Sequence, residues 1–160
     1  MLRKPAFSKP LVQRKYKAVK VTISWPGEFT TQTVRPNKSL EVGMLTNTVN
    51  PNTVVKVVHY RMGPFNKVQR KRIAQKLAMG ALTEYGISKA ALSSGLWRGR
   101  ISMIARGSGT HKGQAVSMNV RIVASPVGKG FLSFYTIAFG TAGDMGRLRQ
   151  RLESAVSFGH

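Results

Sequence analysis

The residue types that most often carry out chemistry are few and scattered in this chain. Its 160 residues include no cysteine, which excludes disulfides and thiolate metal ligands. The acids are Glu28, Glu41, Glu84, Asp144 and Glu153, and the histidines are His59, His111 and His160. None of these positions has the spacing of a paired acid and base or of a metal site. We therefore expect no enzymatic activity, no metal and no cofactor.

Lysine and arginine are the abundant functional groups. Together they number 26 against five acids, which gives a formal net charge of +21. Like charges at this density oppose a compact state, and a bound polyanion offsets the repulsion. The composition therefore predicts a nucleic-acid partner, with RNA favoured over DNA. It also predicts contacts with copies of the chain or with other proteins in a large assembly.

The basic residues form three candidate nucleic-acid-binding surfaces. The first is NKVQRKRIAQKLAMGAL (residues 66–82), where cations gather at the positive end of a predicted helix, as at a phosphate site. The second is the basic N-terminal segment, and the third surrounds Trp97 on glycine-rich segments. The candidate residues are Lys67, Arg70, Lys71, Arg72 and Lys76 in the first surface, Arg3, Lys4, Lys9, Arg14, Lys15 and Lys17 in the second, and Arg98, Arg100, Arg106 and Lys112 in the third.

Strands and an N-terminal arm are predicted to position these surfaces. Residues 1–17 are expected to be an extended basic arm, and residues 18–160 a single domain. Alternating apolar and polar residues predict strands at residues 17–25 and 115–124, and the β-branched residues of TVVKVVHY predict another at residues 53–60. The segment FLSFYTIAF (residues 131–139) is apolar at both alternating sets of positions, which predicts a central strand. The intervening GSGTHKGQ (residues 107–114) is predicted to be a loop.

Helical patterns complete the predicted fold. An apolar stripe at helical spacing predicts an amphipathic helix over about 66–86, with Asn66 as its N-cap. A short second helix is expected at ISKAALSSG (residues 87–95), and a C-terminal helix after Asp144. The predicted fold class is therefore α+β: an antiparallel sheet with one central amphipathic helix, a short following helix and a C-terminal helix, preceded by the arm.

One local pattern is similar to a known DNA-binding motif. LTEYGISKAALSSGLWRG (residues 82–99) resembles a helix-turn-helix with Gly86 at the turn. The segment departs from that pattern at Leu82 and at Gly95. The resemblance implies a DNA-binding regulator whose second helix enters the major groove.

Two structural functions fit the whole chain better than a regulator. The favoured one is a viral coat or nucleocapsid protein that packages a genome by neutralising phosphates, located in the virion or the host cytoplasm. The alternative is a bacterial or organellar ribosomal protein embedded in ribosomal RNA. No run of residues approaches 18 consecutive apolar positions, so no membrane partner is expected, and no small-molecule substrate is expected either.

Overall fold

The fold is built mainly from strands. A computed structural model describes residues 10–140 and 144–158. In that part of the chain the strands are β1 (Val12–Tyr16), β2 (Val21–Trp25), β3 (Thr30–Asn37), β4 (Leu40–Asn50), β5 (Thr53–Arg61), β6 (Ala91–Trp97), β7 (Arg100–His111), β8 (Gln114–Ala124), β9 (Phe131–Phe139) and β10 (Val156–Phe158). The helices are α1 (Lys67–Glu84) and α2 (Met145–Ser154).

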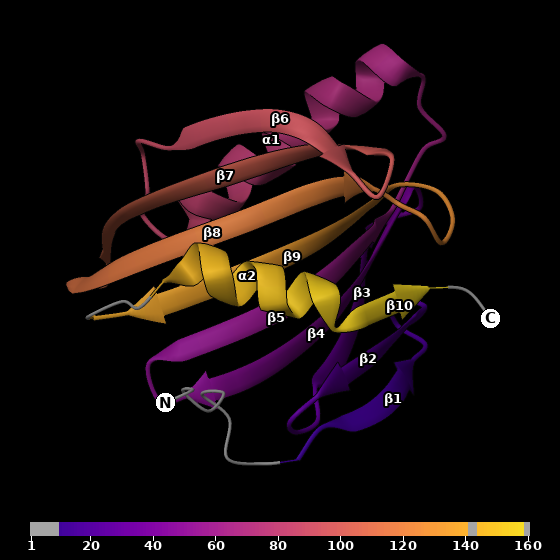
Figure 1. The fold of residues 1–160 in the computed structure, drawn as a ribbon. Coiled ribbons are helices and arrows are strands. Elements are labelled where there is room, and N and C mark those ends of the chain that lie inside the picture. The colour runs from indigo at the N-terminus through magenta and orange to yellow at the C-terminus, as the bar shows by residue number, and fades with distance from the viewer. Residues whose placement is uncertain (1–9, 141–143, 159–160) are drawn as a thin grey trace.

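The strands form two antiparallel sheets (Figure 1). The larger has seven strands in the order β3-β4-β5-β9-β8-β7-β6, and the smaller has three in the order β1-β2-β10. Several consecutive strands are joined by two-residue turns, at residues 38–39, 51–52, 98–99 and 112–113. Between β6 and β7, for example, Arg98 and Gly99 both have positive φ (50° and 79°), which suits a two-residue hairpin turn.

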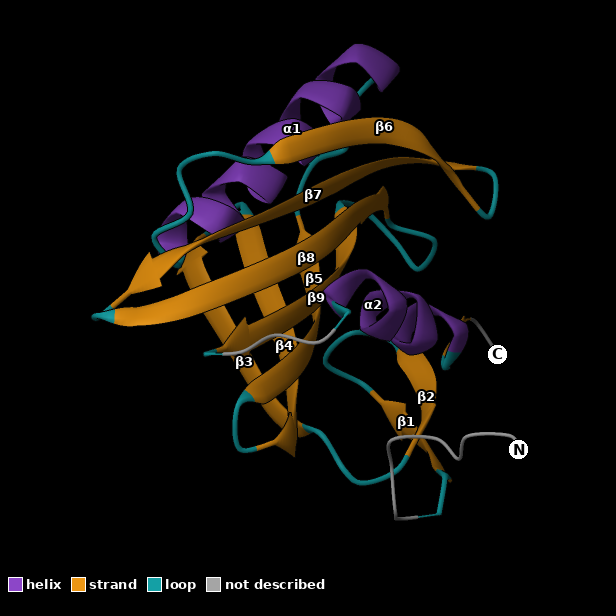
Figure 2. Cartoon of the chain, turned by 60° about the vertical axis from the view of Figure 1, so that its left-hand side comes forward, coloured by secondary structure: helices purple, strands orange, loops and turns teal. Residues whose placement is uncertain are grey.

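The large sheet separates two apolar cores. Figures 1 and 2 show α1 on one face of this sheet and α2 with the small sheet on the other. Helix α1 packs across β7 and β8 on one face, where Leu82 and Met118 are buried. Helix α2 and the small sheet cover the other face, where Trp25 and Phe134 are buried. Strand β9 lies in the middle of the seven and is buried on both faces except at Phe139, so the prediction of a central strand is confirmed.

The small sheet is held against the large one by a close backbone approach. A Cβ on Gly43 of β4 would overlap the carbonyl oxygen of Ala18, in the turn between β1 and β2. The small sheet is also joined to α2, since the N–H of Ser24 donates to the carbonyl of Ala155 at the end of that helix (2.9 Å). Residues from both ends of the chain therefore share one layer.

The predicted fold class is wrong. The described chain is mostly strand, and its two helices lie on the outside of the large sheet rather than at a centre. The short helix expected at residues 87–95 is absent, because residues 91–97 pair with β7 as the edge strand β6. The loop expected at residues 107–114 instead extends β7 to His111 and begins β8 at Gln114.

Individual helix boundaries agree with the sequence. Helix α1 starts after Asn66, whose side chain accepts from the N–H of Gln69 (2.9 Å) while the Gln69 side chain accepts from the N–H of Asn66 (3.0 Å). Helix α2 starts after Asp144, which accepts from the N–H of Arg147 (3.0 Å). These two N-caps are confirmed.

The expected N-terminal arm is partly a strand. Residues 12–16 form β1, which pairs along its whole length with β2. The second half of the segment therefore belongs to the folded domain. Arg3, Lys4 and Lys9 lie outside the described residues.

Candidate anion-binding site

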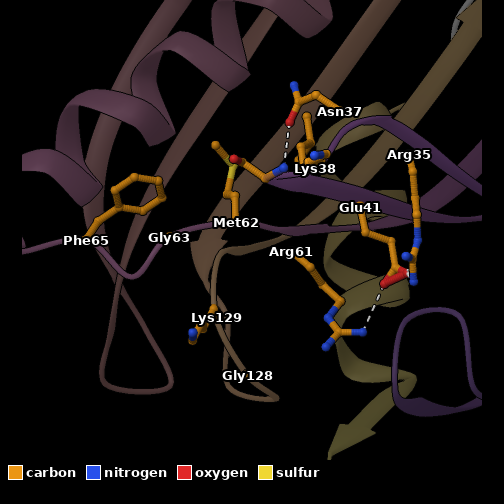
Figure 3. A pocket seen from close by; sticks show the side chains of 12 residues that line it. Arg35, Asn37, Lys38, Glu41, Arg61, Met62, Gly63, Phe65, Gly128 and Lys129 are labelled. Atoms are coloured by element: carbon orange, nitrogen blue, oxygen red, sulfur yellow. Dashed lines mark hydrogen bonds and ion pairs between the residues drawn. The ribbon is translucent and has the colours of Figure 1, made fainter.

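Three connections meet at one end of the large sheet and enclose a groove of about 920 Å³ (Figure 3). They are the β3–β4 turn, the segment between β5 and α1, and the β8–β9 loop. Antiparallel pairing brings them together, because β3, β5 and β8 all end where β4 and β9 begin. The lining residues are Arg35, Asn37, Lys38, Ser39, Leu40, Glu41, Arg61, Met62, Gly63, Phe65, Gly128 and Lys129.

The groove has a cationic side and an apolar side. Four of its lining residues are basic, namely Arg35, Lys38, Arg61 and Lys129, and Glu41 is its one acid. The side chains of Lys38 and Lys129 are exposed. Figure 3 shows Arg35, Arg61 and Glu41 grouped together, with Met62 and Phe65 across from them. A ligand that fills this space meets both positive charge and apolar surface.

Two arginines are held in place by the single carboxylate. Arg35 donates to Glu41 Oε2 from Nε (3.2 Å) and from Nη2 (2.9 Å). Arg61, the register partner of Glu41 on the next strand, donates to Oε1 from Nη1 (2.9 Å). The hydrogen bond from Arg35, supported by the charges of both arginines, lowers the pKa of Glu41 below its usual 4.5. Glu41 therefore stays ionised and orients both guanidinium groups beside the groove.

The β8–β9 loop is held close to β5 by contacts with Tyr60 and His59. A Cβ on Gly130 would overlap the carbonyl oxygen of Tyr60, so the loop can approach β5 this closely only with glycine at that position. Ser125 Oγ lies 2.9 Å from Nε2 of His59 and also accepts from the N–H of Val127 (3.2 Å). These contacts place Lys129 on the same groove as Arg61.

His59 is a buried side chain at this end of the sheet. Its side chain is fully buried, and burial, followed by the nearby charges of Arg61 and Lys20, lowers its pKa from 6.5 to about 4. Its Nδ1 makes no hydrogen bond of normal geometry, although the backbone of Lys129 lies close enough to favour protonation slightly. The imidazole is therefore neutral at pH 7 and serves as a support for the loop.

A second hollow is lined in part by the same loop. It measures about 610 Å³, and its lining includes Lys15 of β1, Lys17 and Lys20 of the β1–β2 turn, and Pro126 and Val127 of the loop. Lys15 and Lys17 were predicted from the sequence as binding residues, and the structure brings them together here. They extend the cationic surface beyond the groove. Arg14 points elsewhere and pairs with Glu28 (2.6 Å).

The predicted cations of α1 separate into different environments. Lys67 and Lys71 line a smaller hollow of about 260 Å³ beside β6. Arg72 and Lys76 are exposed, and Arg70 is half-buried with its Nε lacking a hydrogen-bond partner. The structure therefore does not place all five residues in one environment, and the phosphate site stays a prediction.

The predicted cations around Trp97 are also dispersed. Arg98 donates to the carbonyls of Val156 (3.1 Å) and Glu153 (2.9 Å), and its guanidinium lies 4.3 Å from the centroid of the Trp97 ring. It therefore supports the end of α2. The other members of the set lie apart: Arg100 contacts the Ser125 carbonyl (3.4 Å), Arg106 lines a hollow near the start of α2, and Lys112 lies in the β7–β8 turn.

None of the four groove cations was among the candidates predicted from the sequence. They come from the ends of β3 and β5, the β3–β4 turn and the β8–β9 loop, which are distant in sequence and adjacent only through strand pairing. The one local signal is in the neighbouring residues: Lys38 lies between Asn37 and Ser39, and Lys129 lies between two glycines, residue types that favour turns.

Residues 10–140 and 144–158 contain neither a candidate metal cluster nor a candidate membrane-spanning helix. No group of three or more histidine and acidic side chains there is close enough to hold a metal ion. Within the same residues, neither helix is long and apolar enough to cross a membrane.

Comparisons with known proteins identify the fold. No protein-family model matches the sequence, and no curated protein matches it. The solution structure of cyanobacterial PsbP (CyanoP) from Synechocystis sp. PCC 6803 matches with a TM-score of 0.58 and 7% identity, over 99% of this chain and 98% of that one. A crystal structure of PA94, a Pseudomonas aeruginosa protein of unknown function, matches with a TM-score of 0.48 and 8% identity over 91% and 93%. The PsbP match shows a shared fold.

The functions predicted from the sequence are corrected by these findings. The chain has the fold of a cyanobacterial PsbP, and nothing in that match points to a coat, nucleocapsid or ribosomal protein. Packaging of a genome by a coat protein, and the embedding in ribosomal RNA offered as its alternative, were wrong predictions from charge alone. The helix-turn-helix is also wrong, because its second helix is the strand β6.

Proposed function

We propose that this chain is a non-catalytic binding domain that holds an acidic segment of a partner protein in the groove lined by Arg35, Lys38, Arg61 and Lys129. The groove carries the proposal because four cations and an apolar side, formed by Leu40, Met62 and Phe65, surround one carboxylate. An acidic peptide supplies carboxylates to the cations and apolar side chains to the other side. Pre-oriented arginines suit carboxylates, since a guanidinium binds both oxygens in one plane.

The same groove suits a nucleic acid less well. Phe65 is its one aromatic lining residue, and one face of that ring is covered by Phe131, with centroids 6.3 Å apart and planes inclined by 30°. Bases find little to stack on there, and a phosphate backbone would use only the cations. The nucleic-acid partner expected from composition stays a prediction and is the competing outcome of the test.

The test compares two probes and two matched pairs of substitutions. Binding of a labelled peptide of mixed Glu and Leu, and of an oligonucleotide of equal charge, is followed by fluorescence anisotropy. The groove variant is Lys38→Gln with Lys129→Gln, whose side chains are exposed and absent from every ion pair found in the described residues. The control is Lys76→Gln with Lys112→Gln, which removes the same charge outside the groove.

We expect the groove variant to bind the peptide about tenfold more weakly, since two partly exposed ion pairs contribute roughly 1.4 kcal/mol together. The control variant should lose less than about twofold. Equal losses in the two variants would mean that net charge, and not the groove, binds the probe. An oligonucleotide that binds more tightly than the peptide would overturn the protein-partner proposal in favour of nucleic acid.

A further inference from the structure

The open edge of β6 differs from the other long edges of the two sheets. β6 forms one border of the large sheet, and its sequence ALSSGLW contains no charged residue and no proline. The opposite border, β3, contains Arg35 and Pro36, and the small sheet's β1 border contains Arg14 and Lys15. Charges and prolines are the usual means of preventing a border strand from pairing with another chain. β6 lacks them within its bounds.

The backbone groups on this edge can be assigned from the turn that follows. In a hairpin closed by a two-residue turn, the flanking residues form a hydrogen-bonded pair, here Trp97 with Arg100. The alternation along an antiparallel pair then directs the N–H and C=O groups of Leu96, Ser94 and Leu92 away from β7. The same residues expose apolar surface: Leu96 is 72% exposed and Leu92 38%.

Helix α1 extends beyond this edge. Figures 1 and 2 both show its N-terminal half projecting past β6. At 100° per residue, Lys67 and Lys71 continue the stripe that Ala74 and Ala78 bury against the sheet. Lys67, Lys71 and Ala74 line the hollow of about 260 Å³ together with Ser94, Gly95 and Leu96. The core-facing side of α1 thus ends in two lysines above the open edge of β6.

We propose that β6 accepts an extended acidic segment of a partner protein as an eighth strand of the large sheet. Addition of a strand would satisfy the outward backbone groups of β6, and alternate side chains of the segment would lie under α1. Acidic side chains at those positions would pair with Lys67 and Lys71, and an apolar side chain would cover Leu92. The positive charge at the helix start, for which the sequence provides no acidic neighbour, would then have a partner.

Charge decides between this occupant and a second copy of the chain. Two copies paired through β6 would bring together surfaces that each carry Lys67 and Lys71, within chains of formal net charge +21. Like charges placed together oppose association, whereas an acidic segment is attracted. The residues that line this hollow are also different from those that line the groove of the proposed function, so the two surfaces are tested separately.

The probe is an alternating Glu–Val peptide, compared with its Lys–Val counterpart, and binding is measured by fluorescence anisotropy. Ser94→Pro removes an outward N–H while leaving the N–H groups that face β7, so we expect Glu–Val binding to fall at least about tenfold. Lys67→Glu with Lys71→Glu should reverse the preference to Lys–Val. In the wild type, hydrogen exchange at Leu92, Ser94 and Leu96 should slow when Glu–Val is added.

Two controls separate this proposal from loss of folding and from the groove. The unfolding temperature of each variant shows whether it is folded. If Ser94→Pro is unfolded, the charge-reversal variant by itself is sufficient to test the proposal. In Lys38→Gln with Lys129→Gln, which weakens the groove, addition of Glu–Val should still slow hydrogen exchange at Leu92, Ser94 and Leu96. An unchanged preference after charge reversal, or no slowing of exchange on β6, would overturn the proposal. A dimer of the wild type that Ser94→Pro dissociates would assign the edge to a second copy instead.

Discussion

The β8–β9 loop, which carries Lys129, contacts the buried imidazole ring of His59, so the stability of this region depends on whether that ring is protonated. Ser125 Oγ lies 2.9 Å from its Nε2, and the ring is fully buried. Its pKa is lowered to about 4 by burial and by the charges of Arg61 and Lys20. The folded state therefore favours the neutral ring, whereas the unfolded chain protonates it near pH 6.5.

The resulting pH dependence has a definite sign. Since the folded pKa is depressed, the stabilisation is fully present above about pH 6.5 and is lost as the pH falls toward 4. The difference of about 2.5 units corresponds to on the order of 3 kcal/mol. We predict that His59→Gln flattens the decline of the free energy of unfolding between pH 6.5 and pH 5, measured by urea titration.

Titration of Glu41 does not contribute to the predicted decline, because it occurs below the pH range of that measurement. The pKa of Glu41 is lowered from 4.5, so the stability that it contributes is present above that value and lost only below it. A decline in His59→Gln that equals the wild-type decline would show that other groups cause it.

Helix α2 is attached to the sheet by a buried ionic cluster. Glu153 accepts from Arg121 Nε (2.8 Å) and from Arg149, while Arg149 Nε also donates to Asn119 (2.6 Å) and Arg121 Nη1 to Ser102 (2.6 Å). Arg149 and Glu153 are 4% and 5% exposed. The carboxylate of Glu153 is thus the counter-charge for the guanidinium groups of both Arg121 and Arg149.

We predict that Glu153→Gln lowers the free energy of unfolding by about 3–5 kcal/mol, because it leaves buried guanidinium groups without a counter-charge. Urea unfolding measures the change. Glu84→Gln, at an exposed position at the end of α1, is the matched control and should change stability by less than about 0.5 kcal/mol. Equal effects in the two variants would show that the cluster does not anchor α2.

At the scale of elements, sequence patterns predict what is local and miss what depends on pairing. The caps at Asn66 and Asp144 and the doubly apolar β9 were found because each signal lies within a few residues. ISKAALSSG was assigned to a helix because Ala and Leu favour helices. Pairing of Ala91–Trp97 with β7, directed by the Arg98-Gly99 turn, overrides that preference.

Glycines misled the prediction for β7 in a similar way. Gly107 and Gly109 suggested a loop, but a Cβ on Gly107 would crowd Ile87, and one on Gly109 would overlap the carbonyl oxygen of Gly86. These glycines permit a strand to pass close beneath the end of α1. The groove was missed for a related reason, since Arg35, Arg61 and Lys129 become neighbours only after β3, β5 and β9 take their places in the sheet.

The whole molecule carries far more positive charge than its acids can balance. Its formal net charge is +21, and four of its five acids, Glu28, Glu41, Asp144 and Glu153, already take part in ion pairs. Most cations therefore act on one another through solvent. This repulsion opposes the folded state and favours any acidic partner, whichever surface that partner uses.

Screening that repulsion should stabilise the fold. The Debye length falls from about 30 Å at 0.01 M salt to about 8 Å at 0.15 M, which removes most interactions between distant surface charges. We predict that the unfolding temperature rises by about 4–8 °C over this range, equivalent to roughly 2 kcal/mol for a chain of this size. Polyglutamate added at the lower salt concentration should produce a similar rise, and uncharged polymer should not. An unfolding temperature that falls with salt would mean that the ion pairs outweigh the repulsion, and excess charge would then give the fold no reason to favour an acidic partner.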